Sequence, residues 1–509
     1  MHPDDQRSVL ALAGGAIPLA AWLLAVRLGE GSRPQSLARL LALARLTATG
    51  ERPILLRSLL GGVALAIVLL AVVSRVRAAA RGATAFRAHL RGTKLASPRR
   101  LTRITRERRE RQVTVAGIPM PTSLECLHLL VGGSTGSGKS VLIREVAFSA
   151  LRRGDRIVVA DPNGDMVAKF HRPGDVILNP YDARGLGWSF FNEIRAEYDF
   201  KRFALSLVPR GRTREEEEWC AYARLLLRET ARKLWRAGTP SVKELFRFTT
   251  ISAPNDLKTY LSGTAAESLF VGADKALASA RFVLSAKLSE HLSMPAGDFS
   301  LRSWLGDPRA GNLFITWRED MAEALRPLIS AWVDVLCTSI LSLGEDPSRR
   351  IWMFLDELAS LEKLPSLEDA ATKGRKAGLR IVAGLQSTSQ LERIYGREEA
   401  QTLRSCFRSL VVLGGARTDP KTCEDLSLSL GEHEVEREAH GKSRGGSGTS
   451  TSSHIERVRE RVVLSSEIAG LKDMTGYLAF AGDHPIAKVK LDLVRFGNRV
   501  PAIEERRAC

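Results

Sequence analysis

Cysteine is scarce in this 509-residue sequence, and the few cysteines are scattered. No two of them form a C-x-x-C pair, which excludes a zinc site built on cysteine pairs and a disulfide framework. The spacing therefore favours a reducing compartment, in which the thiols are ordinary buried side chains. The six are Cys126, Cys220, Cys337, Cys406, Cys423 and Cys509.

Acidic residues are also scarce, but only in the first 111 residues. That segment has 20 Lys and Arg against 6 Asp and Glu, whereas residues 112–509 have 55 against 51. The net charge of +18 therefore comes mainly from the N-terminal segment. Because the basic residues there flank apolar stretches, contact with anionic lipid explains them without invoking nucleic acid.

Two stretches near the N-terminus lack charge altogether. Ser8–Val26 is uncharged for 19 residues and Ser58–Ser74 for 17, and Ile54–Leu56 extends the second. Each approaches the length that a helix needs to cross about 30 Å of hydrocarbon. A cleaved signal peptide is the alternative for the first, but the two aspartates before it disfavour that reading. The sequence thus predicts a transmembrane hairpin within residues 1–75, with spans at about 8–26 and 54–74.

The basic residues also predict an orientation. Residues 75–111 carry thirteen basic and two acidic residues, which marks the cytoplasmic side of a membrane. The 27–57 loop holds six arginines as well, so the rule is less decisive there. Because ATP is cytosolic, we place both termini inside. Leu37–Leu46 in the loop is expected to form an amphipathic helix on the outer surface.

A glycine-rich segment follows the apolar run Leu127–Val131 and fits G-x-x-x-x-G-K-[ST]. In this motif the glycines let backbone N–H groups surround phosphate oxygens, Lys139 reaches the β- and γ-phosphates, and the Ser140 hydroxyl ligates Mg²⁺. The segment lies between an expected strand and an expected helix, so it predicts an ATP site. Its residues are Gly133, Ser134, Thr135, Gly136, Ser137, Gly138, Lys139 and Ser140.

A second, acidic element is expected beside the P-loop. The apolar run Ile351–Leu355 is typical of a strand buried on both faces, and Asp356 and Glu357 follow it. Asp356 is predicted to hold Mg²⁺ with Ser140, and Glu357 to act as the general base on water.

Two further candidates come from the next predicted strand. Gln386 follows Arg380–Leu385 and is positioned to sense the γ-phosphate. Arg375 precedes this strand and is a candidate arginine finger for a neighbouring subunit's nucleotide. A solvated arginine at a helix end is the alternative. The sequence has no LSGGQ-type segment, which disfavours an ABC transporter, and Asp356-Glu357-Leu358-Ala359 differs from the helicase DEAD pattern.

The order of predicted elements indicates an α/β fold with a mostly parallel sheet and helices on both faces. Residues 190–300 have helical periodicity and little strand character, which predicts an inserted all-α domain. The flanking parts, residues 76–189 and 301–509, would form the nucleotide-binding domain. Residues 440–453 are rich in Gly and Ser and are expected to be a mobile loop. The strands are predicted at 127–131, 156–160, 312–317, 351–355, 380–385, 409–413, 476–481 and 486–491.

Several of these segments together resemble the conjugative coupling proteins of type IV secretion systems, of the TrwB and TraD kind. The likeness covers nearly the whole chain, and its longest part is a 27-residue run. The segments are Gly133–Ser140, Asp161–Asp165, Leu178–Arg184, Leu355–Leu361, Leu364–Gln390 and Thr475–Tyr477.

This resemblance implies a RecA-like P-loop NTPase domain, an all-α insertion, a two-helix transmembrane anchor and a homohexameric ring at the bacterial inner membrane. ATP and Mg²⁺ are the implied cofactors. DNA, single- or double-stranded, the relaxase with its accessory relaxosome proteins, and the secretion channel are the implied partners. The family's site roles fall on Lys139, Ser140, Asp356, Glu357 and Gln386, and the resemblance favours Arg375 as a finger.

Three alternatives remain at this stage, and one of them, an anchor that uses ATP only for assembly, is disfavoured by the intact Glu357. A chromosome-partitioning translocase of the FtsK kind is also membrane-anchored, but this chain ends soon after its last predicted strand, without a winged-helix module. A secretion ATPase that binds protein effectors and no DNA is hardly separated by sequence.

Overall fold

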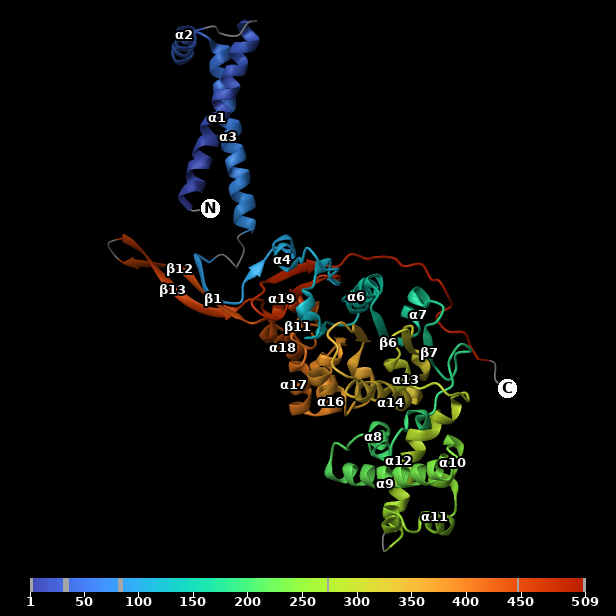
Figure 1. The fold of residues 1–509 in the computed structure, drawn as a ribbon. Coiled ribbons are helices and arrows are strands. Elements are labelled where there is room, and N and C mark those ends of the chain that lie inside the picture. Colours follow the sequence, from blue (N-terminus) through green and yellow to red (C-terminus); the bar gives the residue numbers. More distant parts are fainter. Residues whose placement is uncertain (1–2, 31–35, 81–85, 272–273, 446–447, 507–509) are drawn as a thin grey trace. The chain divides into compact units, whose positions relative to one another are not determined.

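The computed structural model describes residues 3–30, 36–80, 86–271, 274–445 and 448–506 (Figure 1). The chain forms two compact units. The first comprises Met1–His89 and Val435–Val458, and the second comprises Leu90–Glu434 and Arg459–Cys509.

Three helices form most of the first unit: α1 (Pro3–Glu30), α2 (Leu37–Ala48) and α3 (Pro53–Ala80). Helices α1 and α3 approach closely, since a Cβ atom on Gly62 would lie only 2.8 Å from the Cα atom of Pro18. A glycine at this crossing is what lets the two backbones pack.

Helix α2 is attached to this pair. The Trp22 indole donates a hydrogen bond of 3.0 Å to the hydroxyl of Thr47, and the two side chains lie beside a small buried cluster of Val26, Leu43 and Leu55.

Within the residues whose side chains are described, no single helix is long and apolar enough to cross a bilayer. The segments Ala38–Ala48 and Pro53–Leu69 meet the criterion only together, and they are bent by 83° at the break between them. The predicted spans 8–26 and 54–74 extend into positions whose side chains lie outside the described set.

A ten-stranded sheet forms the centre of the second unit. The seven strands from β11 to β7 run parallel, and β14 is antiparallel to β11. Every residue of the central strands β5, β9 and β10 is buried, which matches their continuous apolar runs. In spatial order the strands are β2 (Leu95–Ala96), β15 (Ile486–Lys490), β14 (Thr475–Ala479), β11 (Ser409–Leu413), β5 (Leu129–Gly132), β10 (Leu379–Leu385), β9 (Ile351–Leu355), β6 (Arg156–Pro162), β8 (Leu313–Trp317) and β7 (Val176–Leu178).

The eight strands predicted from the sequence are found, with ends shifted by at most two residues. The α/β fold with helices on both faces is therefore confirmed. Strand β7 was missed because three residues are too few to show a pattern. The short hairpin of β3 (Thr114–Val115) and β4 (Ile118–Pro119) was missed for the same reason.

The sheet separates two hydrophobic cores. Successive side chains of a strand point to opposite faces, and Met353 accordingly lies in one core while Phe354 lies in the other. Helices α4 (Pro98–Thr105), α5 (Thr122–Glu125), α6 (Lys139–Arg153) and α7 (Asp165–Phe170) pack on the Phe354 face. The Met353 face is covered by α13 (Leu301–Gly306), α14 (Ala322–Ile340), α15 (Leu367–Lys373), α16 (Thr388–Tyr395), α17 (Arg397–Ser405), α18 (Pro420–Leu430) and α19 (Ser465–Ala469).

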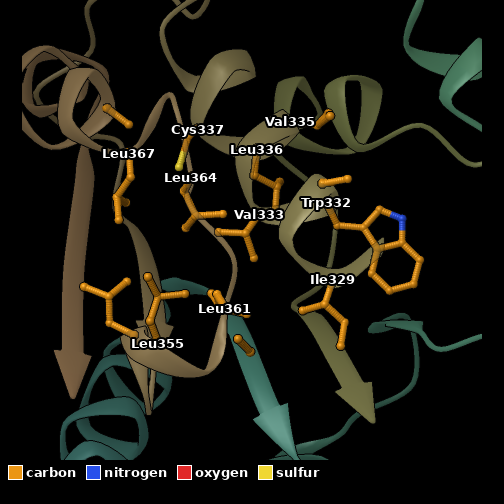
Figure 2. Packing of buried hydrophobic residues seen from close by; sticks show 14 of the residues in the cluster. Ile329, Trp332, Val333, Val335, Leu336, Cys337, Leu355, Leu361, Leu364 and Leu367 are labelled. Atoms are coloured by element: carbon orange, nitrogen blue, oxygen red, sulfur yellow. The ribbon is translucent and has the colours of Figure 1, made fainter. Parts of the chain in front are cut away.

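Helix α14 joins the sheet to the chain that follows β9. Figure 2 shows Ile329, Val333 and Leu336 of α14 beside Leu361 and Leu364, all of them buried. The Asp334 carboxylate, on the same helix, accepts hydrogen bonds from the backbone N–H of Ser366 at 2.7 Å and from the hydroxyl of Ser206 at 2.5 Å.

Between β7 and β8 the described residues form helices and no strand of the sheet. In Figure 1 the green helices of this segment form a group below the sheet. The longest, α9, packs along α12, and a capping Thr213 begins it. The elements are η1 (Phe190–Glu193), α8 (Glu197–Leu207), α9 (Arg214–Arg236), α10 (Val242–Phe246), the π-helical turn η2 (Arg247–Ile251), α11 (Pro254–Leu261), η3 (Ala265–Phe270), α12 (Asp274–Leu288) and η4 (Ser289–Ser293).

The expected mobile loop at 440–453 is wrong. These residues continue two long strands, β12 (Glu432–Gly445) and β13 (Gly448–Arg461), which pair with each other, and β12 also pairs with β1 (Ala88–Gly92). Composition misled the prediction, because hairpin hydrogen bonds join backbone groups and do not require apolar side chains. Residues 446–447 lie outside the described chain.

The buried His128 makes the stability of the second unit pH-dependent. Its ring accepts a hydrogen bond from the backbone N–H of Ile381 at Nδ1 (3.0 Å) and contacts the Ala371 carbonyl through Nε2 (2.7 Å), so the ring is neutral in the folded chain. Burial lowers the pKa of His128 to about 4 from the ordinary 6.5. Its contribution to stability is present above pH 6.5 and is lost as the pH falls towards 4.

We therefore expect the free energy of unfolding to fall with acidification more steeply in the parent than in His128→Asn, by up to about 1.4 kcal/mol per pH unit in this window. Asparagine tolerates the positive φ of 61° at this position. Urea unfolding of both proteins at several pH values measures the difference, in which other titrating groups cancel. Parallel curves for the two proteins would contradict this role.

Candidate nucleotide-binding site

The order of the central strands brings the predicted site residues to one edge of the sheet. Strand β10 lies between β5 and β9 and is parallel to both. The carboxyl ends of these strands therefore share an edge, with the P-loop after β5, Asp356 and Glu357 after β9, and Gln386 after β10. This is the edge at which open parallel sheets bind ligands.

Backbone contacts hold the start of the P-loop. The Gly133 N–H donates to the carbonyl of Leu385 at 3.0 Å, and the Ser134 N–H donates to the carbonyl of Gly414 at 2.8 Å. A Cβ atom on Gly133 would lie 2.7 Å from the Ser137 hydroxyl, so only glycine fits there.

The tip of the loop is open. Thr135 and Gly136 are exposed, whereas the Ser137 hydroxyl donates to the Ser134 carbonyl at 2.7 Å. Gly136 and Gly138 have positive φ angles of 80° and 112°, which side chains rarely adopt. This turn leads directly into the first residue of α6, Lys139.

The Lys139 ammonium lies inside the loop that it belongs to. It donates to the carbonyl oxygens of Gly133 at 2.8 Å and of Ser134 at 3.0 Å. Partial burial lowers the pKa of Lys139, and the nearby carboxylates of Glu357 and Asp356 oppose that shift. An anionic phosphate would be a stronger partner than these carbonyls.

The contact between Ser140 and Asp356 joins the two halves of the predicted site. The Ser140 hydroxyl donates to Oδ2 of Asp356 at 2.8 Å, across 216 residues of sequence. Burial raises the pKa of Asp356, which the Ser140 hydrogen bond and Lys139 oppose. Oδ1 of Asp356 is buried and has no hydrogen-bond partner among the described residues. A hydroxyl and a carboxylate with a free oxygen suit Mg²⁺, which prefers hard oxygen ligands.

Glu357 has a similar unsatisfied oxygen. Its Oε1 atom is buried, and no described group donates to it. Burial raises the pKa of Glu357, while the charge of Lys139 and backbone hydrogen bonds from Ala359 and Gln386 oppose the rise. A carboxylate in this setting can accept a proton from a bound water.

Strand β10 fits tightly against this acidic pair. A Cβ atom on Gly384 would lie 1.8 Å from the Asp356 carbonyl oxygen, so the close approach of the two strands requires glycine. Gln386, two residues later, is half-buried at the same edge.

Arg375 is not brought to this edge. It lies in the turn η7 (Gly374–Ala377) before β10, whose seven residues span about 20 Å. The side chain is exposed, and no described carboxylate lies within ion-pair distance of it. Arg375 is therefore too far from the P-loop of its own chain to contact a nucleotide there.

Asp161, the last residue but one of β6, which lies beside β9, had no predicted role. Its carboxylate accepts hydrogen bonds from the N–H groups of Met166 (3.0 Å) and Val167 (2.8 Å), and burial raises its pKa to about 7. The signal was the one used for Asp356, an apolar run followed by aspartate, but Asp161 was quoted only as part of the resemblance.

A second contact ties this region to the P-loop helix. Arg144 of α6 pairs with Asp165 at 2.9 Å, and both lie close enough to Asp356 to affect its pKa. Arg144 belongs to no segment that the sequence singled out, whereas Asp165 was quoted only as part of the resemblance.

Comparison with known proteins identifies the family. The model of the type IV secretion-system coupling protein DNA-binding domain matches residues 112–492. Coupling protein TraD of Escherichia coli K12 is 31% identical over 412 residues, which are 76% of this chain and 56% of TraD. VirD4, a type IV secretion system-coupling protein of Bartonella henselae, is 31% identical over 144 residues, 28% of this chain and 21% of VirD4.

The solved structures of TrwB are similar over a larger share of their length. The unbound bacterial conjugative coupling protein TrwBdeltaN70 is 64% identical, with a TM-score of 0.80, and the match covers 84% of this chain and 98% of that one. The plasmid coupling protein TrwB in complex with ADP and Mg²⁺ is also 64% identical, with a TM-score of 0.79 over 84% and 99% of the two chains.

These matches confirm the resemblance seen in the motifs and the P-loop NTPase fold. The chain spans about half the length of TraD. With its family match over most of its length and its P-loop joined to an acidic strand end, this chain belongs to the type IV secretion-system coupling proteins.

Proposed function

We propose that the chain is an ATP-driven DNA translocase that couples a relaxase–DNA complex to a type IV secretion channel during bacterial conjugation. The observation that carries the proposal is the 2.8 Å contact between Ser140 and Asp356, which brings the predicted P-loop and the predicted metal-binding carboxylate together from two distant segments. Family membership supports the conjugative role over a chromosome-partitioning translocase.

The residues of the site have separate roles in hydrolysis. ATP with Mg²⁺ supplies the bond that is broken, and Ser140 and Asp356 would hold the metal ion. Lys139 would exchange the loop carbonyls for the β- and γ-phosphates. Glu357 would take the proton of the attacking water, and Gln386 would orient that water. The solved complexes of TrwB with ADP and Mg²⁺ and with an ATP analogue support these cofactors.

The position of Arg375 supports a ring. Because it lies at the edge opposite to its own P-loop, it can complete a nucleotide site only in a neighbouring subunit. An arginine so placed stabilises negative charge in the transition state. We therefore propose a homohexamer, in which residues 76–189 and 301–509 form the motor and residues 190–300 form an all-α domain.

We further propose that residues 1–75 anchor the chain in the bacterial inner membrane with the bulk of the chain in the cytoplasm. Helices α1 and α3 have 28 residues each, about 42 Å at 1.5 Å per residue, which exceeds a bilayer core of about 30 Å. Their described surface exposes large apolar side chains, among them Leu24, Leu65 and Val68. Such a surface suits lipid. Relaxase, accessory relaxosome proteins and the secretion channel would be the protein partners.

Loss of Lys139 or Asp356 tests the site. We expect Lys139→Ala and Asp356→Ala each to lower ATP turnover by about a hundredfold or more, because each removes a charge placed on the phosphates or their metal ion. Phosphate release by the purified full-length protein, with and without DNA, provides the measurement. Lys258→Ala and Asp256→Ala, exposed in the helical segment, are the matched controls. Parental turnover in either site variant would refute the assignment.

Mixing two inactive variants tests whether Arg375 acts between subunits. Arg375→Ala alone should lower turnover about a thousandfold in the assembled protein. Co-assembly of Arg375→Ala with Lys139→Ala should restore part of the activity, because some interfaces then join an intact P-loop to an intact arginine. Mass measurement of the assemblies verifies mixing. An inactive mixture that is shown to have co-assembled would place Arg375 outside the site.

Deletion of residues 1–75 tests the anchor. We expect the full-length chain to sediment with membranes and to resist extraction by high salt or carbonate, whereas the deletion variant should remain in the supernatant. The deletion removes α1 and all but the last five residues of α3, and it removes none of the sheet. A deletion variant that stays with the membrane would show that other residues attach the chain.

A further inference from the structure

A basic pocket lies between the helical segment 190–300 and the chain that follows β9. It is an open hollow of about 420 Å³. The loop between α8 and α9, helices α9 and α12, the start of α14, residues 359–363 and helix α16 line it. Because residues 359–363 follow Glu357 along the chain, the basic pocket borders the segment that carries this residue of the nucleotide site.

Cations dominate this basic pocket. Six basic side chains line it, against the two carboxylates of Glu216 and Glu362. The six are Arg210, Arg212, Lys287, Arg326, Lys363 and Arg393. Such a concentration of one charge is unfavourable without an anion to balance it.

Half of these cations are already paired. Arg212 lies 3.6 Å from Glu216, Lys287 lies 2.5 Å from Glu362, and Lys363 lies 2.6 Å from Glu399. Arg210, Arg326 and Arg393 are exposed, and among the described residues no carboxylate lies within ion-pair distance of them. These three come from three different elements and surround the hollow, so they can meet an external anion together.

An exposed tryptophan lies next to the basic pocket. Glu216 and Cys220, four residues apart on α9, both line the hollow, and residues at this spacing share one face of a helix. Trp219 lies on the adjoining face and is 41% exposed. A large exposed indole beside a group of arginines is typical of surfaces that stack a nucleic-acid base while binding its backbone.

The basic pocket is mechanically connected to the nucleotide site. Ala359 and Leu361, which line it, follow Glu357 by two and four residues. The Glu362 N–H donates to the hydroxyl of Ser330 at 2.8 Å, and Leu361 packs on α14, as Figure 2 shows. A displacement of residues 359–362 by a ligand would therefore be transmitted to the backbone that carries Glu357.

We propose that the basic pocket binds single-stranded DNA, with consecutive phosphates on Arg210, Arg326 and Arg393 and a base stacked on Trp219. The proposal rests on the proposed translocase function and specifies where one subunit holds its substrate. Separate unpaired guanidinium groups match the regularly spaced charges of a phosphodiester backbone. An acidic peptide would use the arginines but would leave Trp219 without a ring to stack.

The salt dependence of binding tests the phosphate contacts. The probe is a fluorescein-labelled oligothymidylate, and the protein is the full-length chain in detergent. We expect the triple variant Arg210→Gln, Arg326→Gln, Arg393→Gln to bind more weakly and to lower the slope of log affinity against log salt by about 2, since each phosphate contact contributes about 0.7. The charge-matched control Lys258→Gln, Lys275→Gln, Arg309→Gln alters exposed residues away from the basic pocket.

A second variant tests the stacking contact. We expect Trp219→Ala to weaken binding of the oligothymidylate about tenfold without changing its salt slope, because stacking carries no charge. Phe282→Ala, which removes another exposed aromatic ring of the helical segment, is the control. Polyglutamate and tripolyphosphate serve as competitors that distinguish a peptide or a free phosphate from a strand.

Three results would overturn the proposal. The first is an unchanged slope of log affinity against log salt in the triple variant, and the second is an equal loss of affinity in the control triple. The third is full competition by polyglutamate at equal charge together with no effect of Trp219→Ala on binding. Failure of this inference is distinguishable from failure of the translocase function. If only the proposed DNA pocket is wrong, the parent protein still binds DNA and hydrolyses ATP faster in its presence. If the translocase function is wrong, the parent protein does neither.

Discussion

The site depends on the parallel alignment of β5, β10 and β9. Each strand delivers one component at its carboxyl end, and the components meet only because Leu385 pairs with Gly132 and Ala383 pairs with Leu355. A shift of one residue would move every side chain of a strand from one hydrophobic core to the other and separate Ser140 from Asp356. The spacing of β9 and β10 leaves no room for a side chain at Gly384, because its backbone lies directly against the Asp356 carbonyl. The same strand register is therefore required both for the stability of the sheet and for the chemistry at its edge.

Charge at this edge is balanced only incompletely. Burial raises the pKa values of Asp356 and Glu357 and lowers that of Lys139, so each group is held in a setting that disfavours its charged form. One oxygen of Asp356 and one of Glu357 are buried without a hydrogen-bond partner among the described residues, and Lys139 donates to the carbonyls of its own loop. A nucleotide with its metal ion would supply the missing negative and positive charge at once, which is a physical basis for tight binding.

Sequence alone predicted much of this edge because its signals are local. Continuous apolar runs located the strands that are buried on both faces, and the P-loop spacing is set by phosphate geometry.

The prediction failed where structure comes from backbone pairing or from distant segments. The Gly/Ser-rich residues of β12 and β13 carry no apolar pattern, and β7 is too short to show one. Asp161 ends a predicted strand, yet only its position beside β9 shows that it belongs to the acidic edge. The basic pocket draws its arginines from three elements, and no sequence window contains all three.

In the proposed assembly, the contact with a neighbouring subunit and the contact with DNA lie at opposite edges of the sheet. Arg375 lies at the amino ends of the strands, where in the proposed ring it would act on a neighbour's nucleotide. The basic pocket lies near the carboxyl ends, only a few residues beyond Glu357. A DNA strand bound in the basic pocket would act on residues 358–362. This segment is fixed to α14 by the hydrogen bond to Ser330 and by the packing of Leu361. Because α14 also binds Ser206 through Asp334, movement of this segment would reach the helices of residues 190–300 directly. In the proposed ring, residues 358–362 would couple hydrolysis to the bound DNA within one subunit, and Arg375 at the opposite edge of the sheet would couple hydrolysis between neighbouring subunits.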